Sequence, residues 1–363
     1  MSRMYFNSST LTPRSQPLGK DGKKCYNRKM KIRENVPLST LTTMRLGGPA
    51  RFVIEIEEPD DIVEAFDFVH DKNLPFFILG GGANTLGHDE GFPGVVIINK
   101  MHGVRVDGDK VNAMGGEEWD KVVEKACEAN LTGIEALSKI PGTAGAAPVQ
   151  NIGAYGQDIS QVLESVEVYD TLIDEFKTLK AEDLKFSYRK SILNSDEAGR
   201  YFVVALTLRL KEGQMERPFY NSLERYIEAN NETDFSPKAI RRMVSAIRAD
   251  KLPDPKEHAS AGSFFKNVYL NDDEAKEAEA KGLPVYHGKD GNKINSGWLI
   301  EHAGLLGKTL HGMRVNEKAA LVLINDSAKS YADLAAARQE IIDAVYEKFG
   351  YKLEQEPVEI VAA

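Results

Sequence analysis

The segment Leu137–Gly156, LSKIPGTAGAAPVQNIGAYG, limits the fold more than any other part of the chain. It consists largely of glycine, alanine and proline, and Lys139 is its one charged side chain. Glycine and proline both disfavour a helix, whereas a flexible linker would be polar and rich in serine. This small-residue segment is therefore either a buried crossover between two halves of a domain, or backbone packed closely against a flat or anionic group.

Length and composition indicate a globular protein of about two or three domains. The chain has 363 residues, of which 42% are hydrophobic and 28% are charged, so it can bury a full core. No apolar run approaches the ~20 residues that a membrane span requires. Cys25 and Cys127 are too few for a disulfide framework or a cysteine-rich metal site, which favours a reducing, cytoplasmic compartment and predicts no metal.

The charge is unevenly distributed. Residues 1–33 contain nine Lys or Arg against a single acid, Asp21, so they carry +8, whereas the rest of the chain carries −17. Residues 1–34 also lack hydrophobic periodicity, and we expect them to form a disordered tail. A basic tail also fits an organelle presequence or a nucleic-acid-binding arm. The acidic body, however, argues against nucleic acid as a main partner.

A second glycine-rich segment follows a short buried strand, Pro75–Leu79. The turn Gly80–Thr85, GGGANT, brings three glycines together immediately after that strand. Converging backbone N–H groups in such a turn can bind a phosphate, but a glycine-rich turn after a strand is also common without any ligand. The turn matches neither a P-loop nor the dinucleotide-binding GxGxxG pattern, so the sequence leaves both interpretations open.

Periodicity predicts the remaining elements. We expect strands at 51–56, 95–99, 164–169, 175–179, 201–210, 320–325 and 351–360, and helices starting at Pro59 and Ser330 and spanning 117–130, 238–251 and 295–306. Ser330 with Asp333 resembles a capping box. Cys127 is most simply a core residue. The stretch Glu212–Asn231 is polar with scattered aromatic side chains, and no element is predicted there.

Several short motifs occur in one order along the chain. They are ILGGGANT, IPGTAGAAPVQNIGAYG, SYRKS, KLPDP, AGSFFKN, SGWLIEHAGLLGK, ALVLIN and LEQE. Together they cover roughly Asn35 to Ile360, and the ordered set resembles the UDP-N-acetylenolpyruvoylglucosamine reductase (MurB) family. Each motif is weak alone, but the set is specific.

This resemblance implies an α+β fold with two domains. A vanillyl-alcohol-oxidase-type FAD-binding domain would occupy residues 35–212. An α/β substrate-binding domain would occupy residues 213–363, with its last strand carrying a catalytic glutamate back to the flavin. The implied reaction is the NADPH-dependent reduction of the UDP-N-acetylglucosamine enol ether to UDP-N-acetylmuramate, in peptidoglycan synthesis. It would use non-covalently bound FAD, with NADPH and the sugar nucleotide as small-molecule partners, and the chain would be a monomer.

The resemblance also implies which residues hold the cofactor. Backbone amides of the two glycine-rich segments would clamp the FAD pyrophosphate, and a second group would lie along the flavin and its ribityl chain. The first group is Gly80, Gly81, Gly82, Ala83, Asn84, Thr85, Pro141, Gly142 and Gly145, and the second is Gln150, Asn151, Gly153 and Tyr155.

Three residues match the catalytic positions of the family. Ser263 would protonate the enol carbon, while Arg189 and Glu356 would stabilise the negatively charged intermediate. A glutamate can help there only if it is protonated or acts through another group, so its pKa should be raised. Because the chain reads LEQEP where the family usually reads LEPE, Glu354 and Glu359 remain alternatives to Glu356.

Further residues match the positions that grip the UDP pyrophosphate: Tyr220, Lys251, Asn267 and Tyr286, with Tyr188 and Arg248 as weaker matches for substrate binding. Tyr220 would lie on an inserted loop that closes over the substrate. Ala319 replaces a polar residue of many relatives, so another group would have to supply that contact. Two other interpretations of the whole chain remain: a flavin oxidase of the same fold, and a binding protein without enzymatic activity.

Overall fold

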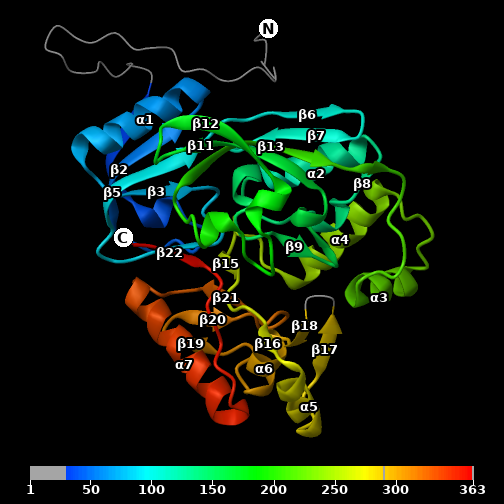
Figure 1. Cartoon of the computed structure of the whole chain (residues 1–363). Helices are drawn as coiled ribbons and strands as arrows, with labels where there is room; N and C mark the ends of the chain where they lie inside the picture. The colour runs from blue at the N-terminus through cyan, green and yellow to red at the C-terminus, as the bar shows by residue number, and fades with distance from the viewer. Residues whose placement is uncertain (1–29, 289–290, 362–363) are drawn as a thin grey trace, which may run out of the picture.

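The computed structural model describes residues 30–288 and 291–361, which form two lobes (Figure 1). Most of the predicted tail, up to residue 29, lies outside the described residues. Its last part does not remain separate from the fold, because strand β1 (Lys31–Pro37) pairs antiparallel with β2 (Pro49–Ile56). The structured chain therefore begins earlier than the sequence predicted.

The first lobe opens with a four-stranded sheet in the order β1-β2-β5-β3, where β3 is Phe76–Leu79 and β5 is Phe92–Asn99. Strands β2, β5 and β3 are parallel. Helix α1 (Pro59–Lys72) begins at the predicted residue, where Asp61 accepts hydrogen bonds from the backbone amides of Glu57 and Glu58. Phe66 of α1 is fully buried in the core that it forms with this sheet.

A second sheet spans the same lobe in the order β12-β11-β13-β7-β6, with all neighbours antiparallel. Its strands are β6 (Val104–Asp107), β7 (Lys110–Met114), β11 (Leu163–Asp170), β12 (Glu175–Lys180) and β13 (Tyr201–Arg209). Helix α2 (Trp119–Glu128) packs against it. Cys127 lies in that core as predicted, and burial raises the pKa of its thiol to about 12.

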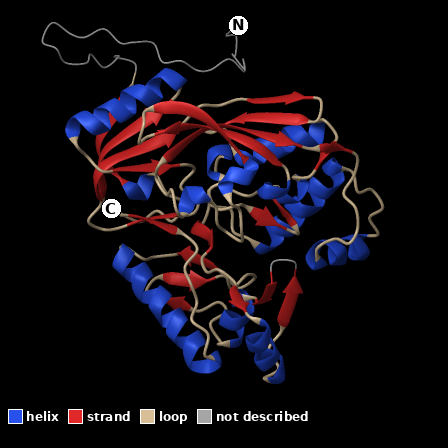
Figure 2. Ribbon diagram, in the orientation of Figure 1, coloured by secondary structure: helices blue, strands red, loops and turns tan. Residues whose placement is uncertain are grey.

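Helix α4 (Pro237–Lys251) lies beside α2 in the first lobe, and α3 (Asn221–Asn230) packs on α4 (Figures 1 and 2). Phe219, Leu223 and Ile240 share a buried cluster with Ala136, which precedes the small-residue segment. Both helices follow the expected domain boundary at 212/213, yet they pack on the lobe that precedes it. Short strand pairs complete this lobe: β8 (Leu131–Thr132) with β14 (Lys211–Glu212), and β9 (Gly153–Ala154) with β10 (Gln157–Asp158).

The second lobe is built on a sheet in the order β15-β21-β20-β19, comprising β15 (Ala259–Ser263), β19 (Thr309–Leu310), β20 (Met313–Val315) and β21 (Val322–Asn325). Helices α6 (Ser296–His302) and α7 (Tyr331–Phe349) pack on it. The Ser330 cap is confirmed, because the Ser330 hydroxyl accepts a hydrogen bond from Asp333 N at 3.1 Å. A smaller sheet, β16 (Val268–Leu270), β18 (Gly291–Ile294) and β17 (Val285–Gly288), packs with α5 (Asp272–Ala280).

The chain finally returns to the first lobe. Strand β22 (Val358–Ile360) pairs in parallel with β4 (Thr85–Gly87), which continues directly from the Gly80–Thr85 turn. The strand predicted over 351–360 is therefore confined to its last three residues. Before β22 the backbone is tied to the second lobe, because Glu356 N donates to Phe264 O at 2.9 Å. In the described part of the chain, no helix combines the length and apolar character that crossing a membrane requires.

Candidate functional site

The Gly80–Thr85 turn and the small-residue segment pack against each other at backbone contact distance. A Cβ added to Gly81 would lie 2.9 Å from the Cα of Gly142, and one added to Gly80 would lie 2.9 Å from the Thr143 hydroxyl. Gly82 has a φ of 64°, and a Cβ there would lie 2.1 Å from the Leu41 carbonyl oxygen. Only glycine allows this approach, so the two segments predicted to be unusual form one structure.

A cavity of about 360 Å³ lies along this junction, and we call it the smaller cavity. None of its described lining residues is charged, and the Thr143 hydroxyl beside it is buried without a hydrogen-bond partner among the described residues. Its lining includes all of Gly80, Gly81, Gly82, Ala83, Asn84, Thr85, Pro141, Gly142, Gly145 and Gln150. Such a wall of backbone and small side chains suits a flat ligand with an anionic group.

Three residues that were predicted to lie along the flavin are not among the residues that line the smaller cavity. Asn151 is buried and donates to Ser187 O at 3.2 Å, and Gly153 lines a neighbouring cavity. Tyr155 lines neither cavity. Its ring packs edge-on against Tyr220 with 5.8 Å between centroids, and it shares a hydrogen bond with Arg248. Tyr155 therefore lies on the side of the site predicted for the substrate.

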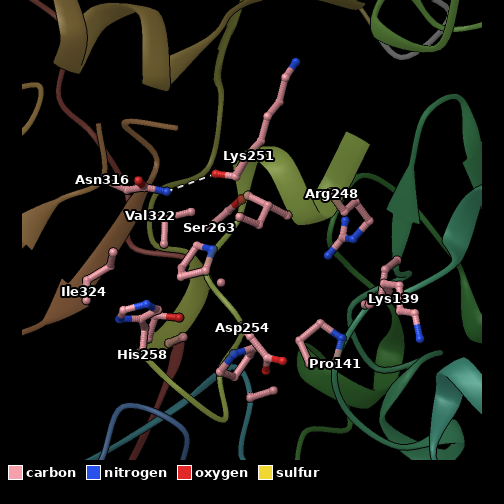
Figure 3. Close-up of a pocket in the computed structure, with 18 of the residues that line it drawn as sticks. Lys139, Pro141, Arg248, Lys251, Asp254, His258, Ser263, Asn316, Val322 and Ile324 are labelled. Carbon is pink, nitrogen blue, oxygen red and sulfur yellow. Dashed lines mark hydrogen bonds between the residues drawn. The ribbon is translucent and has the colours of Figure 1, made fainter. Parts of the chain in front are cut away.

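A larger cavity of about 850 Å³ is lined by both lobes and shares Ala83, Asn84, Pro141 and Gln150 with the smaller one (Figure 3). The two cavities therefore adjoin. Asn84 Nδ2 donates to Gln150 Oε1 at 2.5 Å, and Gln150 Nε2 donates to the Glu356 carbonyl at 3.3 Å. Arg189, Ser263 and Glu356, which are separated widely in the sequence, all line the larger cavity.

Arg189 and Glu356 form a half-buried ion pair. Arg189 Nε donates to Glu356 Oε1 at 3.0 Å, and Arg189 Nη2 donates to Gly153 O at 3.1 Å. The Glu356 side chain is 12% exposed. Burial raises the pKa of Glu356 above its ordinary value, although the Arg189 charge partly offsets this effect. Burial and the neighbouring guanidinium thus act on the Glu356 carboxyl in opposite directions, and burial has the larger effect.

Ser263 ends β15 and is exposed to the larger cavity. The pairing of β15 with β21 is irregular between Ser260 and Ser263, and Gly262 has a φ of 70°. This bulge turns the end of the strand, and bulges commonly re-aim a side chain beside a functional site.

Of the three candidate glutamates, only Glu356 lines the larger cavity. Glu354 is 76% exposed and lies 3.6 Å from the amine of Lys266. Glu359 instead accepts hydrogen bonds from Tyr331, Arg338 and Gln355. These bonds, with one from His88, lower its pKa to about 2 although burial alone would raise it.

The residues predicted to grip the pyrophosphate fall into three places. Asn267 Nδ2 donates to the Tyr188 hydroxyl at 3.3 Å. Tyr220 and Tyr286 are 53% and 47% exposed, and both burial and the neighbouring Tyr286 raise the pKa of Tyr220. Lys251 lines the larger cavity at the end of α4, but Figure 3 shows its amine directed away from Ser263.

Polar residues that no motif singled out also line the larger cavity. They include Lys139, His258, Asn316 and Lys318. Asn316 Nδ2 donates to the Lys251 carbonyl at 3.1 Å (Figure 3). The sequence signals near this wall were the KLPDP motif, Lys251–Pro255, and the unusual Ala319 beside Lys318. Arg248, a weaker match, lines the same cavity, and its buried Nε has no hydrogen-bond partner among the described residues.

Comparison with known proteins identifies the family. Residues 50–172 match the model of an FAD-binding domain, and residues 254–360 match that of the UDP-N-acetylenolpyruvoylglucosamine reductase C-terminal domain. A UDP-N-acetylenolpyruvoylglucosamine reductase of Nocardia farcinica is 36% identical, covering 91% of this chain and 90% of the relative. One of Ralstonia nicotianae is 37% identical, covering 89% of this chain and 98% of the relative. The chain belongs to the UDP-N-acetylenolpyruvoylglucosamine reductase family.

A solved structure supports the same assignment. The chain is similar to the reductase of Thermus caldophilus with a TM-score of 0.64 and 26% sequence identity, covering 91% of this chain and 99% of that one. The expected fold class is confirmed, and with it a flavin-dependent oxidoreductase whose cofactor is FAD. The smaller cavity fits FAD, because its glycine walls leave backbone N–H groups and the Thr143 hydroxyl available to an anionic, flat group.

Among residues 30–288 and 291–361, no group of His, Cys, Asp and Glu could hold a metal ion.

Proposed function

We propose that this chain reduces UDP-N-acetylenolpyruvoylglucosamine to UDP-N-acetylmuramate at the junction of the two cavities, using NADPH. One observation carries the residue roles: Arg189, Ser263 and Glu356 line the larger cavity where it meets the uncharged, glycine-walled one. The names of the family relatives support the reaction. In this proposal the glycine walls hold FAD, and the larger cavity receives the sugar nucleotide.

FAD held by the glycine walls would supply hydride-transfer chemistry between NADPH and the substrate. The chain itself binds and orients the cofactor. Backbone amides of Gly80–Thr85, together with those of Gly142 and Thr143, would hold the pyrophosphate without a charged side chain. Pro141 has no N–H, and the amides of Ala144 and Gly145 donate to Glu117 O and Gly115 O. The hydrogen-bonded pair Asn84–Gln150 lines both cavities, and it fixes the boundary between cofactor and substrate.

Arg189 and Glu356 stabilise the charge that develops on the substrate. Adding hydride to an enol ether conjugated with a carboxylate places negative charge on that carboxylate. The Arg189 guanidinium stabilises such charge, because one Nε bond to Glu356 leaves other N–H groups for the substrate. Glu356, with its raised pKa, can hold a proton and donate a hydrogen bond to the same group.

Ser263 donates the proton that completes the reduction. A hydroxyl is a weak acid, so it serves only when the carbon that it protonates is strongly basic and within hydrogen-bond reach. Its exposed position on the β15 bulge, facing the larger cavity, supports the second condition. The carbon between the new C–H bond and the carboxylate meets the first, because it carries the negative charge of the intermediate.

The UDP part of the substrate is bound by four residues, Lys251, Tyr188, Asn267 and Tyr286. Tyr220, at the N-terminal end of α3, closes over the bound substrate. Closure would exclude water from the reduced cofactor. The chain acts as a monomer in this proposal, because both lobes of one chain line the larger cavity. Its low cysteine content agrees with a cytoplasmic location.

An anaerobic half-reaction tests the proposal. The purified protein is reduced with NADPH, then mixed with UDP-N-acetylenolpyruvoylglucosamine while flavin absorbance is followed. Rapid reoxidation of the flavin by the sugar nucleotide is the expected result. A flavin that is reoxidised only by oxygen would identify an oxidase instead, and a protein that takes up no FAD would contradict both activities.

A further inference from the structure

Asp120 lies outside both cavities but is bonded to a wall of each. It occupies the first turn of α2, and its side chain is 14% exposed. Its carboxylate accepts two hydrogen bonds from Arg241 of α4, at 2.5 and 3.0 Å. It also accepts bonds from the backbone N–H and the amine of Lys139, at 2.7 and 2.8 Å.

The bond to Lys139 fixes the wall that the two cavities share. Lys139 has a φ of 59°, a left-handed conformation that residues other than glycine avoid. Ile140 and Pro141, which follow it, line both cavities. The same turn of α2 also holds this loop at a second point, because Trp119 N donates to Gly142 O at 3.0 Å.

The bond to Arg241 fixes α4, which forms another wall of the larger cavity. Arg248 follows Arg241 by seven residues, which is close to two helical turns, so both lie on one face of α4. Ser245, Arg248 and Lys251 of this helix line the larger cavity. A displacement at Arg241 therefore carries over to the residues at the cavity end of the helix.

The charges of Asp120, Arg241 and Lys139 stabilise the ion pairs between them. Burial alone would raise the pKa of Asp120, but the hydrogen bonds from Arg241 and Lys139 lower it far below its ordinary value. Burial alone would lower the pKa of Arg241, and the bond to Asp120 raises it. Both shifts therefore favour the ionised form of the pair.

We propose that Asp120 is a positioning residue that sets the spacing between the loop Lys139–Gly142 and α4, and so aligns the FAD wall with the sugar-nucleotide wall. The identity of the nucleotide rests on the proposed function, whereas the link to the FAD wall does not. Replacing the carboxylate should shift both walls without removing any group that touches a ligand.

Two variants separate the two links. Asp120→Asn should raise KM for the sugar nucleotide about 10- to 100-fold at saturating FAD, as expected for a small displacement of binding groups, with a smaller effect on kcat. It should also speed FAD release from the holoenzyme, measured by the rise in flavin fluorescence. Arg241→Gln should raise the same KM but leave FAD release close to that of the unmodified protein, because the contacts of Asp120 with Lys139 remain.

Asp170 provides a matched control. It is fully buried and accepts bonds from two Arg200 nitrogens, at 2.8 and 2.7 Å, as well as from the Lys177 amine and Leu172 N. None of these partners lines the larger cavity. Asp170→Asn should lower the melting temperature while leaving KM for the sugar nucleotide unchanged.

Equal effects of Asp120→Asn and Asp170→Asn on KM would overturn the proposal, because Asp120 would then serve stability alone. Unchanged FAD release in Asp120→Asn would also overturn it. If the unmodified protein does not reduce the sugar nucleotide, the proposed function fails, and faster FAD release in Asp120→Asn still establishes the positioning of the FAD wall.

Discussion

Glu356 shows how one residue can combine two opposing electrostatic influences. Burial disfavours its ionised form, while Arg189 at 3.0 Å favours it. Burial has the larger effect, and the pKa is raised. If Arg189 fully offset the effect of burial, Glu356 would stay ionised and would only neutralise the charge of Arg189. The incomplete compensation leaves a group able to donate a hydrogen bond and a guanidinium that still attracts negative charge.

Replacing Ser263 separates proton transfer from cofactor chemistry. In Ser263→Ala, reduction of the flavin by NADPH should proceed normally, because no proton from this side chain is needed there. Reoxidation by the sugar nucleotide should slow by about 10²–10⁴-fold, the usual cost of losing a general acid. Stopped-flow measurement of both half-reactions checks this, and equal slowing of the two would make Ser263 a structural residue.

The sequence predicted which residues gather at the site better than it predicted where each one faces. Motifs placed Arg189, Ser263 and Glu356 in one site, and the structure brings them to one cavity. The family resemblance implied that Tyr155 lies along the flavin. It instead lies in the turn between β9 and β10 with a φ of 50°, and this turn directs it toward Tyr220. The spacing of residues in the sequence does not reveal a change of chain direction of this kind.

Among the elements, the Gly80–Thr85 turn and the small-residue segment depend on each other. Each alone was open to an ordinary interpretation. Their function as a wall follows from their contact, in which Gly81 faces Gly142 with no space for a side chain. Backbone packed so closely cannot yield without moving one of the two segments.

Adding one methyl group at this contact should separate the two segments. In Gly81→Ala, the new Cβ would lie 2.9 Å from the Cα of Gly142. Cβ atoms in proteins essentially never lie that close to another heavy atom to which they are not bonded. The bound FAD per protein should fall, with affinity reduced by at least tenfold, or about 1.4 kcal/mol. Absorbance of the purified protein and FAD titration measure this. Gly288→Ala, whose Cβ would meet nothing nearer than 3.7 Å, should keep full FAD content.

Elements with local signals were predicted well, and those that depend on distant partners were not. Helix α1 has Pro59 at its start and α7 has its Ser330 cap, both visible in the sequence. Helix α3 buries only Leu223 and Ile227, too few to reveal a periodic face. The final strand is short because it pairs with β4 from the other lobe, and no local pattern contains that partner.

At the scale of the whole molecule, polar contacts and one strand pair join the two lobes. Thr43 donates to Ser260 O at 2.5 Å, and the amides of Tyr331 and Ala332 donate to Asp89 at 2.7 and 3.1 Å. The strand pair β22–β4 is secured by Glu359, which Tyr331 and Arg338 of α7 hold from the second lobe. The larger cavity therefore keeps its shape only while the lobes stay docked.

Glu359 makes this docking dependent on pH. Its folded-state pKa of about 2 lies below the ordinary value of 4.5, so its stabilising effect is complete above pH 4.5 and is lost as the pH falls toward 2. Glu359→Gln should therefore lower the unfolding free energy at pH 7 by about 1–3 kcal/mol, the usual cost of lost charge-assisted hydrogen bonds.

Thermal unfolding at pH 7 and at pH 3 checks this expectation, since the difference between Glu359→Gln and the unmodified protein should shrink at the lower pH. Glu354→Gln, at a carboxylate that is 76% exposed, should change little at either pH. A difference that stays constant with pH would show that charge is not the source of the effect.

The return of the chain to its first lobe also has a consequence for biosynthesis. Gln150 and the Glu356 carbonyl that it contacts are 206 positions apart. At a translation rate of about 5–20 residues per second, the ribosome delivers the glycine walls roughly 10–40 s before the carboxylate that completes the catalytic centre. During that interval the nascent chain lacks Glu356 and also Val358, which lines the smaller cavity, so neither cavity is complete until the last strand has been synthesised.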